Sequence, residues 1–431
     1  MPIRWITLIL ILLLTAGCEG TSVISNPESV QTLRGNDKTV VIFWHTYNDR
    51  ETRLLMQEMI PAFEKGHPDI RIKCINLANN NELKYSLIAR ASSGRGPDIV
   101  RMDITWVPEF SHKGLLEPLN ALPGFNELKD AFHQKAMNVG HYNDRYYSLP
   151  LNLYTKLTIF NRELLARAGY SKPPDTMDEI LELARKRHYI IGLGGLEVWD
   201  TLPYVYSLGG SFMDAGFTRA SGFLNSDSTV RAVEKLAKLY KEKLIHLSAV
   251  TQNRDNWARV RSGSMLLTDE APWFFSLLKE SDKRQALKQT LSVPFPRGNG
   301  TSSIIGGENL VMMKGSRHPA EAWAFMKWMT GVEGQLIMAK AGLIPTNKEA
   351  VKALNVSRES YLYPYAQAVD DIFLRPPVKN WSQVGEVYTV YLHQIFLGNL
   401  SAREGLDRAA GEIDRLLEEE GEPRHSAGPG S

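Results

Sequence analysis

The first part of the chain alternates strand and helix patterns, and this alternation limits the possible folds more than any other feature. The apolar run Val40–Trp44 predicts a buried strand, and the helical pattern that follows it ends at Gly66 and Pro68. Ile70–Ile75 and Asp98–Met102 predict two more strands, again with a helical pattern between them. Because strands joined by helices form parallel sheets with right-handed crossovers, the sequence predicts an α/β fold.

The length and charge of the chain indicate the size of the molecule and its kind of partner. With 431 residues, 43% of them hydrophobic, the chain is long enough for two lobes that each have a core. Lys and Arg together number 50, and Asp and Glu together number 48. This balance lacks the basic excess of a nucleic-acid-binding protein, so an uncharged or weakly charged partner is favoured.

The first residues have the pattern of an export signal. Arg4 precedes the uncharged run Trp5–Ala16, which is too short to span a membrane and fits the hydrophobic region of a secretory signal. The small residues before Cys18 resemble the bacterial lipobox, in which the cysteine is acylated and becomes the first residue of the mature chain. We therefore expect a signal peptide over residues 1–17 and a lipid-anchored tether over residues 18–36. An ordinary cleaved signal or a buried N-terminal helix remains the alternative.

Several blocks of residues follow one another in an order that carries more information than any single block. The blocks are Gly96–Val100 with Gly114–Leu116, Tyr147–Pro150, Phe160–Leu165 before Ala168-Gly169, Gly306–Leu310, His318–Trp323, and Arg375–Pro377 before Glu386-Val387. Together they resemble the extracellular solute-binding proteins of ABC importers, in particular the carbohydrate-binding group that includes maltose- and trehalose-binding proteins. The resemblance extends from about Val40 to Leu417.

The resemblance implies an α/β fold of two hinged lobes, the type II periplasmic-binding-protein fold, in which the chain crosses three times between the lobes. We expect the crossings near Leu149–Tyr154, Pro296–Ser303 and Leu343–Thr346. The expected N-terminal lobe comprises residues 37–150 and 304–343, the expected C-terminal lobe residues 151–303 and 344–419, and the expected disordered tail residues 420–431. Two such lobes can bury a small polar solute almost completely.

A sugar needs two kinds of protein surface. Its C–H faces pack on aromatic rings, and its hydroxyl rim binds charged or amide groups. The residues that we expect to bind the sugar are His45, Asp103, Trp106, Asn152, Tyr154, Trp199, Trp273, Glu308 and Arg375. His45 and Asp103 follow predicted parallel strands, whose carboxyl ends face the ligand crevice in α/β sheets. The alternative for Asp103 is a helix cap or a hinge salt bridge.

The resemblance bears on several of these residues individually. Trp273 follows Ala271-Pro272, where relatives commonly carry a Pro-Trp pair that lines the cleft, and Arg375 resembles an arginine that reaches ligand hydroxyls. Glu308 departs from the family, because many relatives have a tryptophan after the paired glycines. This departure implies either a smaller or more polar solute or another tryptophan against the sugar ring. Packing in the core is the alternative for Trp106 and Trp273, and a surface salt bridge is the alternative for Arg375.

Motifs for catalysis and nucleotide binding are missing from the sequence. It contains no G-x-x-x-x-G-K-[ST], G-x-G-x-x-G, H-E-x-x-H, C-x-x-C or G-x-S-x-G pattern, and its ten histidines include no pair at helical metal-ligand spacing. We therefore expect a protein that is not an enzyme and that uses neither cofactor nor metal.

The predicted function is a lipid-anchored, monomeric receptor that captures a sugar outside the cytoplasm and delivers it to ABC permease subunits. One alternative is a sugar-sensing receptor for a membrane signalling partner. The other is an exported glycoside hydrolase, which needs two carboxylates flanking the scissile bond, and Asp103 with Glu308 is the candidate pair. Saturable binding of oligosaccharides without turnover separates a receptor from a hydrolase.

Overall fold

The computed structural model describes residues 38–248, 255–298, 303–358, 360–368, 372–373 and 375–421. The expected signal peptide, the tether with Cys18 and nearly all of the expected tail lie outside the described residues. From Lys38 onward the chain forms one compact unit. Among the described helices, none is both long and apolar enough to cross a bilayer.

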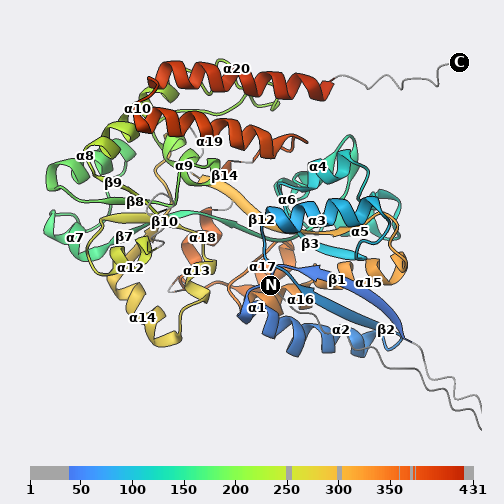
Figure 1. Cartoon of the computed structure of the whole chain (residues 1–431). Helices are drawn as coiled ribbons and strands as arrows, with labels where there is room; N and C mark the ends of the chain where they lie inside the picture. The colour runs from blue at the N-terminus through green and yellow to red at the C-terminus, as the bar shows by residue number, and fades with distance from the viewer. Residues whose placement is uncertain are drawn as a thin grey trace, which may run out of the picture. The chain divides into compact units, whose positions relative to one another are not determined.

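The first of two large sheets is mixed (Figure 1). Its strands are β1 (Thr39–His45), β2 (Ile70–Asn76), β3 (Ile99–Asp103), β6 (Ser148–Thr155), β12 (Ser303–Met312), β13 (Ile344–Pro345) and β14 (Ile372–Phe373). They lie in the order β13-β6-β12-β3-β1-β2, and β14 pairs with β12. β1 is parallel to β2 and β3, whereas β12 is antiparallel to β3 and β6. The parallel part follows the strand–helix alternation of the sequence, so the predicted α/β class is confirmed.

Helices cover both faces of this sheet. They are α1 (Asp49–Leu54), the π-helical turn Leu55–Met59, α2 (Ile60–Gly66), α3 (Asn81–Ser92), α4 (Val107–His112), α15 (Pro319–Met329), α16 (Val332–Ala339) and α17 (Lys348–Leu354). The 3-10 turn Leu119–Ala121, α5 (Phe125–Lys129), α6 (Gln134–Asn138), β4 (His141–Tyr142) and β5 (Arg145–Tyr146) lead to β6. Leu83 and Leu87 of α3 pack with Val100, whereas Phe63 of α2 packs in another cluster with Ile99. Because Ile99 and Val100 point to opposite faces of β3, the sheet is buried on both sides, as Figure 1 shows for α2 and α3.

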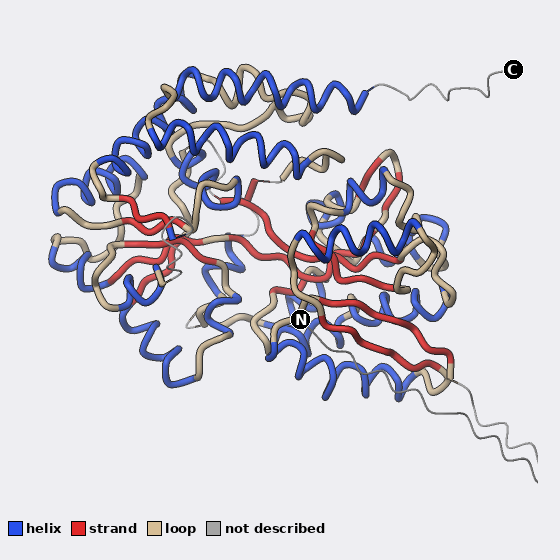
Figure 2. Tube along the Cα trace, viewed as in Figure 1, coloured by secondary structure: helices blue, strands red, loops and turns tan. Residues whose placement is uncertain are grey.

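The second sheet has five strands, coloured red in Figure 2. In spatial order they are β11 (Thr290–Val293), β7 (Leu157–Asn161), β10 (Leu267–Glu270), β8 (Ile191–Leu193) and β9 (Ile245–Leu247). β8 is parallel to β9 and β10, whereas β7 is antiparallel to β10 and β11. The remaining helices are α7 (Arg162–Arg167), α8 (Met177–Arg187), α9 (Val198–Ser207), α10 (Asp227–Lys241), α12 (Asn256–Arg261), α13 (Trp273–Ser276), α14 (Glu280–Gln289), α18 (Tyr363–Ala368), α19 (Trp381–Leu397) and α20 (Ala402–Gly421). The long helices α19 and α20 pack along each other and share one apolar cluster with α8, α9 and α10.

Side-chain caps fix where helices begin in both parts of the chain. Asn48 and Glu51 form a capping box at α1, and Thr176 and Glu179 form one at α8. Each box satisfies backbone N–H groups that the first turn of a helix leaves free, which stabilises the helix by about 1 kcal/mol. The helix starts are therefore specified locally by the sequence.

The chain passes between the sheets next to β12. β6 of the first sheet and β7 of the second are separated by Lys156 alone. Thr155 pairs with Ile305 of β12, and Ser303 Oγ donates to the Lys156 carbonyl at 2.8 Å. This pairing brings β12, and with it Glu308, close to the passage. The expected lobe boundaries and the crossing expected near Leu149–Tyr154 stay predictions.

Candidate functional site

A buried ion pair joins neighbouring strands of the first sheet. Arg101 lies within β3, and its Nη2 is 2.7 Å from Oε2 of Glu308 on β12. The two side chains are 5% and 7% exposed, so each charge depends on the other for compensation. Asn152 Nδ2 donates to the same Oε2 at 2.6 Å, and the Tyr154 hydroxyl donates to Oε1 at 3.3 Å. Because Asn152 and Tyr154 lie on β6, the carboxylate of Glu308 links three strands.

Burial and charge act in opposite directions on this carboxylate. Burial raises the pKa of Glu308, whereas the Arg101 guanidinium and the Asn152 amide lower it. Burial also raises the pKa of Tyr154 well above its ordinary value, and the charges of Glu308 and Asp103 raise it further. The phenol therefore keeps its proton at neutral pH and remains a hydrogen-bond donor.

Beside this pair, an acid and a base meet next to an aromatic ring. Asp103 ends β3, and its Oδ1 accepts from N and Oγ1 of Thr105 at 2.8 and 2.6 Å. Arg375 Nη2 lies 3.9 Å from the same oxygen, and its guanidinium carbon is 5.4 Å from the centroid of the Trp199 ring. Within the described part of the chain, Asp103 Oδ2 and the N–H groups of Arg375 have no hydrogen-bond partner. Nε of Arg375 is also buried, so the protein leaves it an unpaired donor.

Trp199 and Tyr154 supply the aromatic part of the site. Their rings meet edge to face, with centroids 5.9 Å apart and planes at 88°. Gly306 of β12 lies against both rings, since a Cβ atom at this position would overlap the Tyr154 ring and come within 2.9 Å of the Trp199 ring. The glycine therefore lets the two rings pack on the strand.

A second buried charge network contacts Trp199 from the other sheet. Lys156 Nζ forms an ion pair with Asp269 of β10, lies 3.3 Å from Asp200 Oδ1 and donates to the Trp199 carbonyl at 3.2 Å. Burial lowers the pKa of Lys156, but Asp269 and Asp200 outweigh this effect, so the lysine is charged. Burial raises the pKa of Glu270, the last residue of β10, to about 7.

The structure brings most of the predicted site residues together. The residues that meet are Asp103, Asn152, Tyr154, Trp199, Glu308 and Arg375. Trp273 begins α13, and its side chain lies outside the described residues. Trp106 packs in the apolar cluster beneath α3 and α4, which is the alternative considered for it above.

His45 also packs in the core. It is 2% exposed, and its ring centroid lies 5.5 Å from that of Phe43 and 5.2 Å from that of Tyr47. Burial and the nearby Arg101 lower the pKa of His45 to about 4, so the ring is neutral at pH 7. The end of β1 was expected to face the crevice, but here the strand ends inside the packed part of the sheet.

Sequence reasoning missed Arg101 and Lys156. Arg101 is the one charge among Ile99–Met102, and Lys156 is the one charge among Thr155–Leu157. A charged residue inside a buried strand requires a partner of opposite charge. A single charge within an apolar stretch of sequence could therefore have indicated both buried ion pairs.

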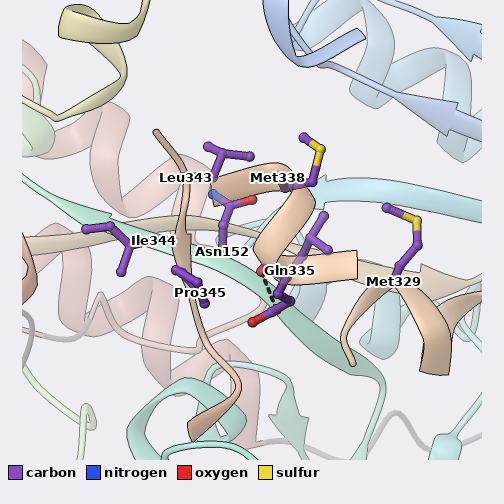
Figure 3. Close-up of a pocket in the computed structure, with 8 residues that line it drawn as sticks. Asn152, Met329, Gln335, Met338, Leu343, Ile344 and Pro345 are labelled. Atoms are coloured by element: carbon purple, nitrogen blue, oxygen red, sulfur yellow. Dashed lines mark hydrogen bonds between the residues drawn. The ribbon is translucent and has the colours of Figure 1, made fainter. Parts of the chain in front are cut away.

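In the first sheet β6 lies between β12 and β13. A small cavity lies on the β13 side of β6, next to α16 (Figure 3). Its volume is about 10 Å³, which is room for about one water molecule. The lining residues are Leu151, Asn152, Met329, Gln335, Met338, Leu343, Ile344 and Pro345. Gln335 Nε2 donates to the Leu151 carbonyl at 2.7 Å, drawn as the dashed line in Figure 3. The cavity is too small for a sugar and is a packing gap.

The chain matches the family described as "Bacterial extracellular solute-binding protein" over residues 58–360, and it belongs to this family. A putative binding protein of Brucella abortus (strain 2308) is 23% identical over 379 residues, which cover 84% of this chain and 89% of the relative. The maltotriose-binding protein of Pyrococcus abyssi is 23% identical over 346 residues, covering 78% and 73%. These relatives are binding proteins.

Solved structures show the same fold. The GacH receptor of Streptomyces glaucescens, solved unliganded and in complex with acarbose, aligns with a TM-score of 0.76 and 24% identity over 88% of this chain and 99% of that chain. The sugar-binding protein MalE of Xanthomonas citri aligns with a TM-score of 0.77 and 19% identity over 89% and 98%. The two-lobed α/β fold implied by the resemblance is thereby confirmed.

Proposed function

We propose that this chain captures a sugar or short oligosaccharide outside the cytoplasm and delivers it to the permease subunits of an ABC importer. The arrangement of Arg375 and Asp103 beside Trp199 carries this proposal. The Arg375 side chain is 13% exposed and makes no hydrogen bond within the described chain, so its N–H groups need acceptors. Asp103 Oδ2 needs a donor. A sugar hydroxyl can accept a hydrogen bond from Arg375 and donate one to Asp103. The C–H face of a sugar also packs well on an indole ring.

The charges near these residues favour a neutral ligand. Arg101 pairs with Glu308 and Arg375 lies near Asp103, so each of these cations already has a carboxylate beside it. A charged ligand would leave one charge without compensation in a poorly hydrated site. The maltotriose and acarbose that relatives and structural neighbours bind support a carbohydrate.

We place the sugar between the two lobes whose boundaries are predicted above. Asp103 then comes from the N-terminal lobe, and Trp199 and Arg375 come from the C-terminal lobe. Trp273, at the start of α13, is expected to add a second ring from the C-terminal side. A ligand that bridges both sides binds the closed form better than the open form and shifts the population toward closure.

The proposed binding can be tested by thermal shift and calorimetry with maltotriose and acarbose. A sugar at about 100 times its Kd stabilises the folded chain by about 2.7 kcal/mol, which raises the melting temperature. Trp199→Ala is expected to lose most of this shift. Tyr85→Ala is the control, because Tyr85 is 66% exposed on α3. The absence of a shift with every neutral sugar would contradict the proposal.

We further propose that the mature chain is a monomer tethered by acylated Cys18, with the folded part outside the cytoplasm. The lipobox-like pattern before Cys18 supports this anchor. Cys18→Ala is expected to leave a protein that binds sugar but no longer sediments with membranes. Continued membrane attachment of the variant would rule out the lipid anchor.

Finally, we propose that the chain binds sugar without hydrolysing it. A glycosidase acid must give its proton to the leaving oxygen of the substrate, but both oxygens of Glu308 accept from protein donors. Incubation with maltotriose is expected to leave the sugar intact. Release of glucose would instead favour an exported hydrolase.

A further inference from the structure

Both oxygens of Glu308 are engaged by the protein itself. Oε2 lies 2.7 Å from Arg101 and 2.6 Å from its donor on Asn152, and Oε1 accepts from Tyr154 at 3.3 Å. The Glu308 side chain is 7% exposed, and protein donors take three of the roughly four acceptor positions of its carboxylate, so a sugar hydroxyl has one position left unless it displaces a donor. Displacement would leave a buried donor unpaired. These contacts favour a role behind the sugar over the direct contact expected from the sequence.

Arg101 is held on its other side as well. Its Nη1 donates to Thr46 Oγ1 at 2.6 Å, and its guanidinium carbon lies 4.3 Å from the centroid of the Tyr47 ring. Both partners belong to the loop that follows β1. A planar guanidinium fixed in this way presents Nη2 to Glu308 in one orientation.

We propose that Arg101 and Glu308 form a positioning pair for the sugar site, an inference that rests on the function proposed above. Arg101 lowers the pKa of Glu308 against the effect of burial, and the carboxylate accepts the hydrogen bond that orients the Tyr154 hydroxyl. Tyr154 in turn sets the edge-to-face contact with Trp199, at 5.9 Å between centroids. Neither member of the pair touches the sugar.

The surrounding charges explain why the pair depends on Arg101. The titratable groups that face Glu308 are Arg101 and Asp103 from β3, Tyr154 from β6, Tyr47 from the loop after β1 and Glu51 from α1. Burial and the two acids raise the pKa of Glu308, and Arg101 opposes them. Without the guanidinium, the carboxyl group takes up a proton at a higher pH. A neutral carboxyl is a weaker acceptor for the Tyr154 hydroxyl, so the ring loses its fixed orientation.

The pair can be tested without any sugar by NMR of the full-length chain labelled with ¹³C at tyrosine Cζ and glutamate Cδ. Tyr154→Phe assigns the Tyr154 signal, and Glu308→Gln assigns the Glu308 signal. In Arg101→Met the titration midpoint of Glu308 is expected to rise by about 1 to 3 pH units. The Tyr154 signal is expected to titrate with the same midpoint. A structural role alone would not couple the two signals.

Two variants serve as controls for this experiment. Arg101→Lys keeps the positive charge and is expected to retain most of the wild-type midpoint, and Arg95→Met removes an exposed arginine and is expected to change nothing. The proposal is overturned if the titration midpoint of Glu308 is unchanged in Arg101→Met. It is also overturned if the Tyr154 signal does not titrate with the Glu308 midpoint. If Arg101→Met fails to fold, Glu308→Gln decides the question: a Tyr154 signal that stays at its wild-type position overturns the proposal.

Calorimetry with maltotriose at about pH 5.5 and about pH 8 links the pair to function. In Arg101→Met the affinity is expected to be roughly tenfold weaker at the lower pH than at the higher, beyond any change in wild type. If the ratio of the affinities at the two pH values is the same in Arg101→Met and in wild type, the link to the sugar site is overturned. If neither maltotriose nor acarbose binds the wild-type chain, the proposed function fails, and the NMR result still decides whether Arg101 and Glu308 position Tyr154.

Discussion

Each of the two sheets buries charged groups near the passage at Lys156, and the two clusters differ in their balance. In the first sheet, Arg101 pairs with Glu308 and Arg375 lies near Asp103, and Glu51 is the third carboxyl group beside these two cations. Each cation of this cluster therefore has its own carboxylate partner, and the charges are close to balance. Such a cluster suits the floor of a site for neutral ligands.

The cluster of the second sheet has too few bases. Lys156 contacts Asp269 and Asp200. Glu270 lies close enough for its charge to raise the pKa of Lys156. One cation then serves three carboxyl groups, and the resulting repulsion adds to the effect of burial on Glu270. The two clusters beside the passage thus differ in charge, since two cations serve three carboxyl groups in the first and one cation serves three in the second.

Removal of Lys156 is expected to have the largest effect on this contrast. Lys156→Met leaves the fully buried Asp269 without its cation, which destabilises the fold by about 3 to 5 kcal/mol in denaturant unfolding. The matched control is Lys172→Met, because Lys172 pairs with Asp175 at the surface with side chains 73% and 78% exposed. The control is expected to lose at most about 1 kcal/mol. Equal losses in both variants would show that the second cluster does not depend on its lysine.

The first cluster is expected to respond in binding rather than in stability. Asp103→Asn keeps the size of the side chain but removes the charge beside Arg375, so sugar affinity falls by about 1.5 to 3 kcal/mol in calorimetry. Asp69→Asn, at an exposed position before β2, is the control. Unaltered affinity in Asp103→Asn would remove this residue from the site.

The second cluster is expected to make stability depend on pH through Glu270. The pKa of Glu270 is raised by burial to about 7 in the folded chain, above its ordinary value of 4.5, while Lys156 lowers it and Asp269 and Asp200 raise it. The folded state therefore holds the proton more tightly than the unfolded state between these values, and stability falls as the pH rises through this window. Tyr365 also contacts this residue, through a hydrogen bond to its carbonyl.

Glu270→Gln is expected to abolish that dependence, recovering about 1 to 3 kcal/mol at pH values above the window. Melting temperatures of variant and wild type measured across the window test this. Glu127→Gln, at an exposed position of α5, is the control. Parallel pH profiles for wild type and Glu270→Gln would contradict the assignment.

Local patterns were sufficient to predict the parallel strands and the place of Asp103. Its position follows from topology, because the end of β3 lies at the edge where ligands bind in α/β sheets. The same rule failed for His45, since neighbouring aromatic rings and Arg101 enclose the end of β1. A strand end is exposed only if nothing packs over it, and a sequence does not show what packs over it.

The charge pairs could not be predicted for a related reason. Arg101 and Glu308 are separated by 207 positions, and Lys156 and Asp269 by 113. Each partner is an ordinary charged residue until the sheets form, so no local pattern identifies the pair. Trp199 and Arg375 were identified by position and by resemblance, and their contact depends on tertiary structure alone.

A contact between the helices of the two sheets gives the smallest expected effect. Lys84 on α3 is 5% exposed, forms an ion pair with Glu109 and donates to Ser382 Oγ on α19 at 2.7 Å. Since α3 covers the first sheet and α19 packs with the second, this bond exists only when the two parts are close. Ser382→Ala therefore weakens the closed form and leaves the open form unchanged.

Because measured affinity includes the free energy of closure, Ser382→Ala is expected to weaken maltotriose binding by a factor of up to about ten, with little change in melting temperature without sugar. Ser92→Ala, at the exposed end of α3, is the control. If Ser382→Ala binds maltotriose as tightly as wild type, the Lys84 contact makes no contribution to closure, and the two clusters would be joined through Lys156 and β12 instead.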